Sequence, residues 1–394
     1  MENVGKKVRV GIVGIGNIGS AHLRSIGDGH VAGMTLAAAC DISASRREFC
    51  RAQYPDVPVF DSADGMIGSG LCDAVIVSVP HPHHAEIAGA ALRAGLHVLV
   101  EKPEDVSVSA AAELNRIASE SGKVFGIMFN QRTNPLFARA RELVRGGEIG
   151  KLQRSVWIIT NWYRTQAYYN SGSWRATWRG EGGGVLLNQA PHNLDLWQWI
   201  CGMPEEITAF CDVGKYHDIE VEDDATIFAR YPGGATGTFI TTTGEYPGTN
   251  RLEITGDKGK IVIENGTLRL WKLSVSSAEF SASAGEHDPK PDIAYSEYVP
   301  DGKGEGHRGI LRNFAEAVLT GSGLLAPGYD GINELSISNA AYLSSWTGKA
   351  VKLPLDASEF DRLLSERRRN GADTGGAAET KTDGEYLDRW QVNF

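Results

Sequence analysis

Apolar positions in the first third of the chain form short runs, separated by stretches with the period of helices. The runs are VRVGIVG, MTLAAACD, AVIVSVP, HVLVEKP and VFGIMFN, and helical patterns lie between them at residues 18–27, 46–54, 84–94 and 109–121. Short, mainly apolar strands that alternate with helices are typical of a doubly wound parallel sheet. We therefore expect one α/β domain over residues 1–130, with its ligand crevice beyond the carboxyl ends of the strands.

The pattern changes in the second half of the chain. The segments LQRSVWIITNWY, EEITAFCDV, DATIFARY, ATGTFITTT, NRLEITGD and GKIVIENGTLRLWKL read as strands joined by tight turns. They predict a second α/β domain over residues 131–355 with a large, open, mainly antiparallel sheet. Two helical patterns at residues 309–319 and 332–348 are expected to pack on the first domain or on this sheet. We expect the open face to pair with another subunit in a dimer or tetramer.

Residues 356–394 form a polar C-terminal extension in this interpretation. Its arginine run at 367–369 is interpreted as a solvated helix face, and residues 370–385 are polar, glycine-rich and without periodicity. The last residues, YLDRWQVNF, recover apolar character and are expected to dock on a partner.

A glycine-rich turn, Gly14-x-Gly16-x-x-Gly19, follows the first apolar run directly. In the Rossmann fingerprint the three glycines allow, in order, a tight turn, the approach of a pyrophosphate, and close packing of helix on strand. Asn17 and Ile18 open the helix, whose N-terminal N–H groups attract an anion. The alternative is a purely structural glycine turn.

Asp41 closes the second apolar strand, 22 residues after Gly19. A carboxylate there accepts hydrogen bonds from the hydroxyls of an adenosine ribose and repels a 2′-phosphate. The sequence therefore favours NAD over NADP as the cofactor. Arg46 and Arg47 lie close by and are able to accommodate a phosphate, so NADP stays as the less favoured alternative.

Residues that follow the later strands should line the same crevice. The cofactor-binding candidates among them are Ser78, Pro80, His81, Glu101, Lys102 and Gln131. The lysine is able to donate a hydrogen bond to a substrate oxygen during hydride transfer; the alternative is a surface lysine paired with Glu101. Three histidines, His81, His83 and His84, suggest a metal, but no acid or cysteine completes a ligand set at usual spacing, and no metal site is expected.

The stretch GGGVLLNQAPHNLDLWQWICG carries a second candidate site. Asn188 and His192 project from one side if a helix runs through Pro191; otherwise a loop enters the helix at His192. Asp195 follows by three residues and is also placed against that face. A neutral histidine is able to take a proton from a hydroxyl while hydride leaves the same carbon. The alternative is a buried structural histidine.

Aromatic residues crowd the segment before this stretch, interleaved with arginines. Tyr163, Trp174 and Arg175 are assigned to the substrate pocket with Asn188 and His192, because aromatic faces stack on sugar rings and guanidinium groups bind hydroxyls or carboxylates. A dimer interface has the same composition and stays open as the alternative.

Composition limits the partners. The chain has 394 residues, 42% of them hydrophobic, and a net charge of −10, which disfavours nucleic acid as a partner. Its five cysteines are widely spaced, without a CxxC pair, so neither a disulfide framework nor a zinc site is suggested. No apolar run approaches the ~20 residues of a membrane span, and the first residues lack a signal-peptide pattern. A cytoplasmic protein without membrane contact is expected.

Taken together, GIVGIGNIGSAH, VLVEKP and GGGVLLNQAPHNLDLWQWICG resemble the Gfo/Idh/MocA oxidoreductase family, over roughly residues 8–352. The resemblance implies a Rossmann domain followed by an open-sheet α/β domain, NAD or NADP, and sugars, inositols or glycosides as substrates. It places the family's catalytic lysine on Lys102 and its catalytic histidine on His192. The family commonly has an aspartate where this chain has Asn188, so a two-residue proton relay is not available and either His192 or Lys102 has to act alone as the base.

The resemblance and the residues together predict oxidation of a ring hydroxyl, at C3 of a sugar, with His192 as base and Lys102 polarising the oxygen. Two alternatives remain. One is a glycoside hydrolase that recycles its NAD through a 3-keto intermediate, with Tyr163 or His192 as the second base. The other is a non-catalytic regulator that senses nucleotide.

Overall fold

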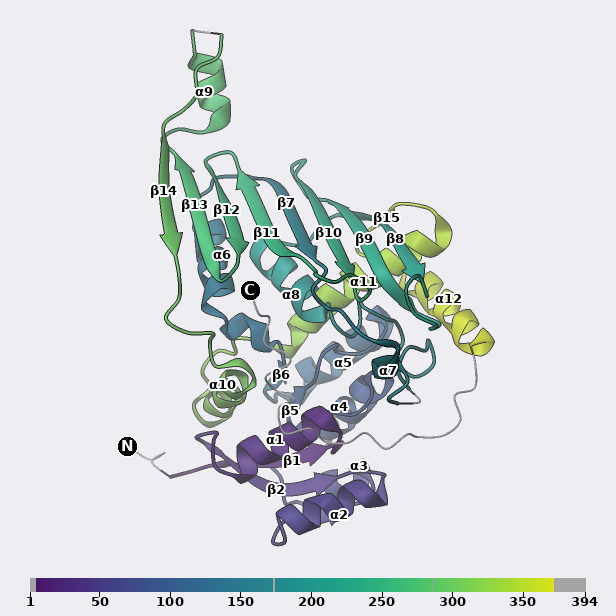
Figure 1. The fold of residues 1–394 in the computed structure, drawn as a ribbon. Helices are drawn as coiled ribbons and strands as arrows, with labels where there is room; N and C mark the ends of the chain where they lie inside the picture. The colour runs from purple at the N-terminus through teal and green to yellow at the C-terminus, as the bar shows by residue number, and fades with distance from the viewer. Residues whose placement is uncertain (1–4, 173, 286, 372–394) are drawn as a thin grey trace.

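The computed structural model describes residues 5–172, 174–285 and 287–371, which fold around two sheets (Figure 1). The predictions for residues 372–394, including the expected docking of the terminal YLDRWQVNF, lie outside the described residues. In the described part, no helix combines the length and the apolar character needed to cross a membrane.

The first sheet has six strands in the order β3-β2-β1-β4-β5-β6, and all its pairs are parallel. The strands are β1 (Val8–Val13), β2 (Met34–Cys40), β3 (Val59–Phe60), β4 (Ala74–Val77), β5 (His97–Val100) and β6 (Phe125–Ile127). The four residues of β4 are all buried, because helices cover both faces of the sheet. This order is that of a Rossmann domain and confirms the predicted fold class.

Along the chain, a helix lies between each two consecutive strands of this domain. They are α1 (Asn17–Gly27), α2 (Ala44–Gln53), α3 (Ala63–Ile67), α4 (His84–Arg93) and α5 (Val108–Ser121), with 3-10 turns at His81–His83 and Asn130–Thr133. In α5 the Ser107 hydroxyl accepts from the N–H of Ala110, and Gly122 ends the helix in the left-handed region. Helix α1 has no side-chain cap, since its N-cap is Gly16.

The second sheet has nine strands in the order β14-β13-β12-β11-β7-β10-β9-β8-β15. Its strands are β7 (Leu152–Ile159), β8 (Glu206–Val213), β9 (Glu222–Arg230), β10 (Thr236–Thr242), β11 (Asn250–Gly256), β12 (Gly259–Glu264), β13 (Thr267–Leu273), β14 (Ile293–Tyr298) and β15 (Val351–Lys352). Seven of its eight pairs are antiparallel, and only β7 and β10 run parallel. The predicted open, mainly antiparallel sheet is therefore confirmed.

Helices lie against one face of this sheet (Figure 1). The helices of the second half are α6 (Pro135–Arg145), α7 (Gln166–Tyr169), α8 (Pro191–Cys201), α9 (Ser277–Ser283), α10 (Gly306–Thr320), α11 (Gly331–Thr347) and α12 (Ala357–Asn370), with a 3-10 turn at Gly328–Asp330. Residues 191–200 of α8 are all buried, so the helix is enclosed rather than amphipathic. On the other face Phe210 and Tyr295 are exposed.

Two helices differ from the expected domain boundaries. Helix α10 lies within the predicted second domain in sequence, and its Ile310, Leu311 and Phe314 join the core of the Rossmann domain, which is one of the two placements expected for residues 309–319. Helix α12 falls within the predicted polar extension, yet Phe360 and Leu364 belong to the core of the second domain.

The interpretation of residues 367–369 as a wholly solvated face is wrong in part. The Arg367 guanidinium lies 3.8 Å from the centre of the Trp346 ring, and Arg368 donates to the carbonyl of Trp178. Charge patterning alone does not show that an arginine stacks on an aromatic ring.

Candidate active site

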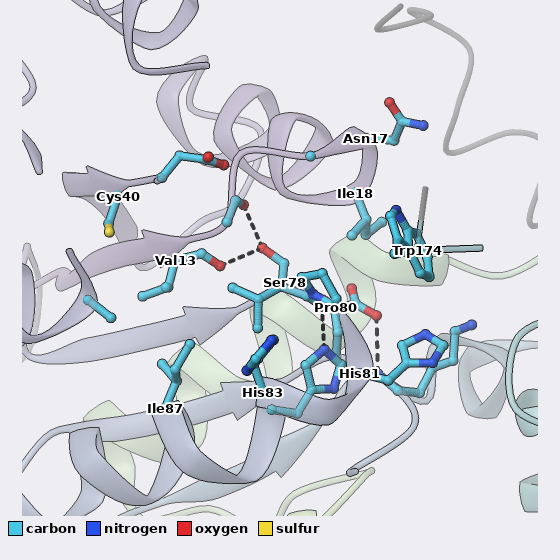
Figure 2. A pocket seen from close by; sticks show the side chains of 18 of the residues that line it. Val13, Asn17, Ile18, Cys40, Ser78, Pro80, His81, His83, Ile87 and Trp174 are labelled. Carbon is cyan, nitrogen blue, oxygen red and sulfur yellow. Dashed lines mark hydrogen bonds between the residues drawn. The ribbon is translucent and has the colours of Figure 1, made fainter. Parts of the chain in front are cut away.

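A cavity of about 540 Å³ runs along the carboxyl ends of the Rossmann strands and reaches into the second domain. In Figure 2, Cys40 at the end of β2 and Trp174 of the second domain lie at opposite ends of the view. Of the predicted site residues, the cavity is lined by Gly14, Gly16, Asn17, Ile18, Asp41, Ser78, Pro80, His81, Glu101, Lys102, Trp174, Arg175, Asn188 and His192. Most of the predicted cofactor-binding residues and most of the predicted substrate-binding residues therefore line one cavity.

The glycine turn is shaped by close backbone contacts. Gly14 has a φ of 91°, and a Cβ on it would lie 2.6 Å from the Ser78 carbonyl oxygen. A Cβ on Gly19 would lie 1.8 Å from the Gly14 carbonyl oxygen, so Gly19 acts by packing and does not line the cavity. The Ser78 hydroxyl donates to the carbonyls of Val13 and Gly14 and ties the turn to β4 (Figure 2).

Gly16 differs from the other two glycines, because nothing lies within 4 Å of a Cβ placed on it. It borders the cavity at the uncapped start of α1. Asn17 lies beside it, with its Oδ1 buried and without a hydrogen-bond partner in the described chain. Free N–H groups next to open space form the kind of site that binds an anionic phosphate.

Asp41 lies at the end of β2, where two backbone N–H groups hold its carboxylate. Its Oδ2 accepts from Ile15 at 2.6 Å, and its Oδ1 accepts from Ser43 at 2.8 Å. Arg47 donates to the carbonyls of Asp41 and Ile42, both at 2.9 Å. The carboxylate is thus fixed at the cavity wall, and each of its oxygens retains a second lone pair for a ligand hydroxyl.

Of the three histidines after β4, His81 and His84 pack edge to face with their ring centres 5.8 Å apart, and each has a ring nitrogen close to a backbone carbonyl. The ring nitrogens of His84 lie 2.7 and 2.8 Å from the carbonyl oxygens of Pro103 and Val79. The His81 ring lies edge-on to Trp174, with its Nδ1 3.2 Å from the Glu181 carbonyl oxygen. In the described ranges, no three His, Cys, Asp or Glu side chains are placed to hold a metal ion.

Lys102 reaches from the end of β5 to the second domain. Its Nζ donates to the carbonyl oxygen of Asn188 at 2.8 Å, and burial lowers the pKa of the ammonium to about 8. Glu101 faces the other way, with Oε1 2.8 Å from His22 Nε2. Lys102 is therefore not a surface lysine, and it joins the two domains at the cavity.

The segment before α8 is held by a buried carboxylate on β9. Glu222 accepts from the N–H groups of Gly184 and Leu186, both at 2.9 Å, and from the Tyr342 hydroxyl at 2.7 Å. Burial raises the pKa of Glu222 to about 7, against the effect of these donors. This anchor fixes the turn that presents Asn188 to the cavity.

Helix α8 begins at Pro191, so Asn188 lies in the turn before it and His192 in its first turn. Of the two arrangements considered for this stretch, the loop entering the helix is observed, because proline suits the first position of a helix. His192 is 2% exposed, and its Nδ1 has no hydrogen-bond partner among the described residues. Burial, and then the charges of Lys102 and His307, lower the pKa of His192 well below its usual value.

Besides Gly19, the predicted residues Tyr163 and Gln131 do not line the cavity, and neither does Asp195 on α8. Tyr163 is 46% exposed and packs against Tyr246 at a ring distance of 5.7 Å. Gln131 is buried in the 3-10 turn after β6, outside the cavity wall. Asp195 binds Arg132 through both oxygens, at 2.6 and 2.9 Å, instead of sharing the surroundings of His192.

The sequence analysis missed His307 and Glu181. His307, from the first turn of α10, lines the cavity, and burial lowers its pKa to about 4. A single histidine at the start of a distant helix gives no sequence signal. Glu181 precedes the Gly182–Gly184 run and is buried against Asn188. An isolated acid before three glycines is a visible feature, but it has no defined spacing to a known motif.

Chemically, the cavity combines an anion-binding helix start, a ribose-type carboxylate and a polar end formed by Lys102, Asn188 and His192. The ammonium is a donor, and the buried histidine is neutral and able to accept a proton. Such a set suits transfer of a hydride between a nucleotide and a hydroxylated carbon.

Family models match both halves of the chain. The NAD-binding Rossmann fold of the GFO_IDH_MocA oxidoreductase family matches residues 8–129, and the GFO/IDH/MocA C-terminal domain matches residues 137–262. Among curated relatives, scyllo-inositol 2-dehydrogenase (NAD(+)) of Bacillus subtilis is 25% identical, over 88% of this chain and 96% of the relative. Myo-inositol 2-dehydrogenase of Thermotoga maritima is 26% identical, over 88% and 98%.

A solved structure has the same overall arrangement. The WlbA dehydrogenase from Bordetella pertussis, crystallised with NADH and UDP-GlcNAcA, aligns with a TM-score of 0.74 and 25% identity, over 89% of this chain and 100% of that one. The family matches of the two domains and the strand order of the first sheet point to the same family. The chain belongs to the Gfo/Idh/MocA family and is an oxidoreductase with an NAD-binding Rossmann domain.

Proposed function

We propose that this enzyme oxidises a ring hydroxyl of a sugar, inositol or glycoside, at C3 where the ring is a pyranose. One observation carries the proposal: Lys102 of the first domain and the segment from Asn188 to His192 of the second domain meet at one end of the cavity, joined by the 2.8 Å bond from Lys102 Nζ. Inositol dehydrogenases among the relatives and the UDP-sugar complex of the WlbA dehydrogenase support a polyol substrate.

The residues at the other end fit NAD. Gly16 leaves room for a pyrophosphate at the start of α1. The Asp41 carboxylate can accept hydrogen bonds from the ribose hydroxyls, and Ser78 and Pro80 line the cavity farther along. When bound, NAD supplies the acceptor for the hydride that leaves the substrate carbon.

The proposed chemistry assigns a separate task to each side chain. Neutral His192 accepts the proton of the substrate hydroxyl, and the Lys102 ammonium donates to the same oxygen as negative charge develops on it. Asn188 orients the hydroxyl through its amide, and Trp174 with Arg175 borders the ring. Tyr163 is outside this cavity, which removes one of the two candidates for a second base in a glycosidase.

A substrate panel tests the proposal. Free sugars, inositols and aryl glycosides are incubated with the enzyme and NAD, and NADH absorbance and aglycone release are followed in parallel. The proposal predicts NADH formation with at least one cyclic polyol, without aglycone release. Aglycone release without NADH accumulation, or NAD binding without turnover on the whole panel, contradicts it.

Substitutions at two glycines of the turn should have different effects, one on the stability of the fold and the other on cofactor binding. Gly19→Ala places a Cβ against the Gly14 carbonyl and is expected to cost ~2 kcal/mol or more of unfolding free energy. Gly16→Ala meets no protein atom, so we expect an unchanged Tm and NADH binding weaker by roughly tenfold. Thermal denaturation and NADH fluorescence titration measure the two effects. A lower Tm for Gly16→Ala would contradict the assignment.

The Asp41 carboxylate should set the preference for NAD. Asp41→Asn keeps the size of the side chain and removes the charge that would face a 2′-phosphate. We expect the ratio of the Kd values for NADPH and NADH to fall by roughly tenfold, because like charges in contact cost ~1 kcal/mol or more at a protein surface. Fluorescence titrations with both nucleotides give this ratio, and an unchanged ratio would assign the preference to other residues.

We propose further that the enzyme is a homo-oligomer that pairs through the open face of the second sheet. Apolar side chains on that face, such as Phe210 and Tyr295, are more than half exposed. Light scattering coupled to size exclusion measures the mass, and a monomer would contradict this proposal.

A further inference from the structure

Glu181 is a buried carboxylate directly behind the substrate end of the cavity. It is 1% exposed, and it lies in the turn that precedes the Gly182–Gly184 run. Its Oε2 accepts from the backbone N–H of Ala176 at 2.7 Å, and its Oε1 accepts from the side-chain amide of Asn188. Both of its oxygens therefore face donors.

This contact decides which way the Asn188 amide points. A carboxylate oxygen only accepts, so the group that faces Glu181 is the NH₂ of the amide and not its carbonyl. The Tyr168 hydroxyl lies 3.5 Å from the same Nδ2. The backbone of Asn188 is fixed as well, since its N–H donates to Gly184 and its carbonyl accepts from Lys102. Asn188 lines the cavity, and with its NH₂ held by Glu181 the amide oxygen remains as its side-chain acceptor for a substrate hydroxyl.

Glu181 also supplies negative charge to a pocket rich in cations. Burial lowers the pKa of Lys102, and the charge of Glu181 opposes this shift. Burial likewise raises the pKa of Glu181, and the charges of Arg175 and Lys102 oppose that rise. The ionisable groups that face Lys102 are Glu101, Glu181, Glu334 and Arg175, together with the histidines His81, His84, His192 and His307. Asn188 itself carries no charge.

We propose that Glu181 is a positioning residue of the oxidation site: its carboxylate fixes the Asn188 amide with the oxygen toward the substrate hydroxyl, and it provides the negative charge that residue 188 lacks. The proposal rests on the proposed function. It predicts that the carboxylate of residue 181 and the amide of residue 188 act as one acceptor–donor pair. Exchange of the carboxylate and the amide between the two positions should therefore keep the pair intact.

The test is a reciprocal exchange. In Glu181→Gln, the new amide must turn its oxygen to the fixed N–H of Ala176, so its NH₂ faces Asn188 and reverses that amide. In Asn188→Asp, two carboxylates face each other. In the double variant Glu181→Gln/Asn188→Asp, the glutamine NH₂ donates to the aspartate, whose second oxygen faces the substrate.

We expect each single variant to lose roughly tenfold to a hundredfold in kcat/KM. Glu181→Gln turns the NH₂ of Asn188 toward the substrate hydroxyl, and Asn188→Asp leaves two buried carboxylates facing each other without a donor between them. The double variant should be more active than either single variant. Losses that multiply in the double variant, or an unaffected Glu181→Gln, would overturn the proposal. If Glu181→Gln does not fold, Asn188→Asp and the double variant decide: relief of the Asn188→Asp defect supports the proposal, and no relief overturns it.

A second readout needs no substrate and separates this inference from the proposed function. The rate of Lys102 acetylation by acetic anhydride is followed against pH by mass spectrometry in the wild-type and Glu181→Gln proteins. Loss of the negative charge should shift the Lys102 titration to lower pH, and restoration of a carboxylate in the double variant should shift it back. An unmoved titration overturns the charge assignment, even if no polyol in the panel is oxidised.

Discussion

His192→Ala is expected to lower kcat by about 10²-fold or more, because it removes the group that accepts the hydroxyl proton. The imidazole is buried at the polar end of the cavity, and its lowered pKa keeps it neutral and ready to accept a proton at physiological pH. Initial rates at saturating NAD and substrate measure the loss. NADH affinity should be unchanged, since the nucleotide is assigned to α1 and Asp41.

The matched control is His30→Ala, which removes an exposed histidine from the loop after α1. It should leave kcat unchanged. Turnover within a few-fold of wild type in His192→Ala would end the assignment of His192 as the base. A large loss in both variants would indicate that histidine removal disturbs the fold.

The fold could be predicted because its local signals agree with its packing. Strands buried on both faces are expected to be apolar throughout; the run that becomes β4 is so, and the run that becomes β1 is interrupted only by Arg9 near its start. The glycine turn is dictated by backbone contacts between neighbouring segments, as with Gly19 against Gly14. For α10 the sequence left two placements open, because an apolar helix face does not say which of two cores it joins. For α12 the few apolar residues that reach the core, Phe360 and Leu364, were hidden in a segment that is polar on average.

The candidate site was predictable where a residue follows a strand or opens a helix. Lys102 and Asp41 end strands, and a sheet brings such positions to one edge. The assignment of Tyr163 to the substrate pocket had no such support, because the residue lies in a loop whose course the sequence does not determine. Its ring packs on Tyr246 instead. His307 and Glu181 come into contact with the site only through the packing of whole elements, which no local pattern records.

Substitution of Lys102 should also lower kcat strongly, because it removes the charge of the ammonium group. Lys102→Met removes the donor that faces the developing oxyanion, so kcat should fall by about 10²-fold or more. Because burial lowers the pKa of Lys102 to about 8, the ammonium is present below that pH and is lost above it. In the wild-type enzyme, kcat/KM should therefore decline as the pH rises through about 8.

Two substitutions separate the charge from the geometry. Lys102→Arg stays protonated at every accessible pH, so its residual activity should lack the decline near pH 8. The control Lys349→Met changes an exposed lysine at the end of α11 and should keep both the rate and the wild-type pH profile. If Lys102→Arg retained the decline, another group would have to titrate there. The lysine would then keep its bond to Asn188 as its only assigned task, holding the two domains together at the cavity.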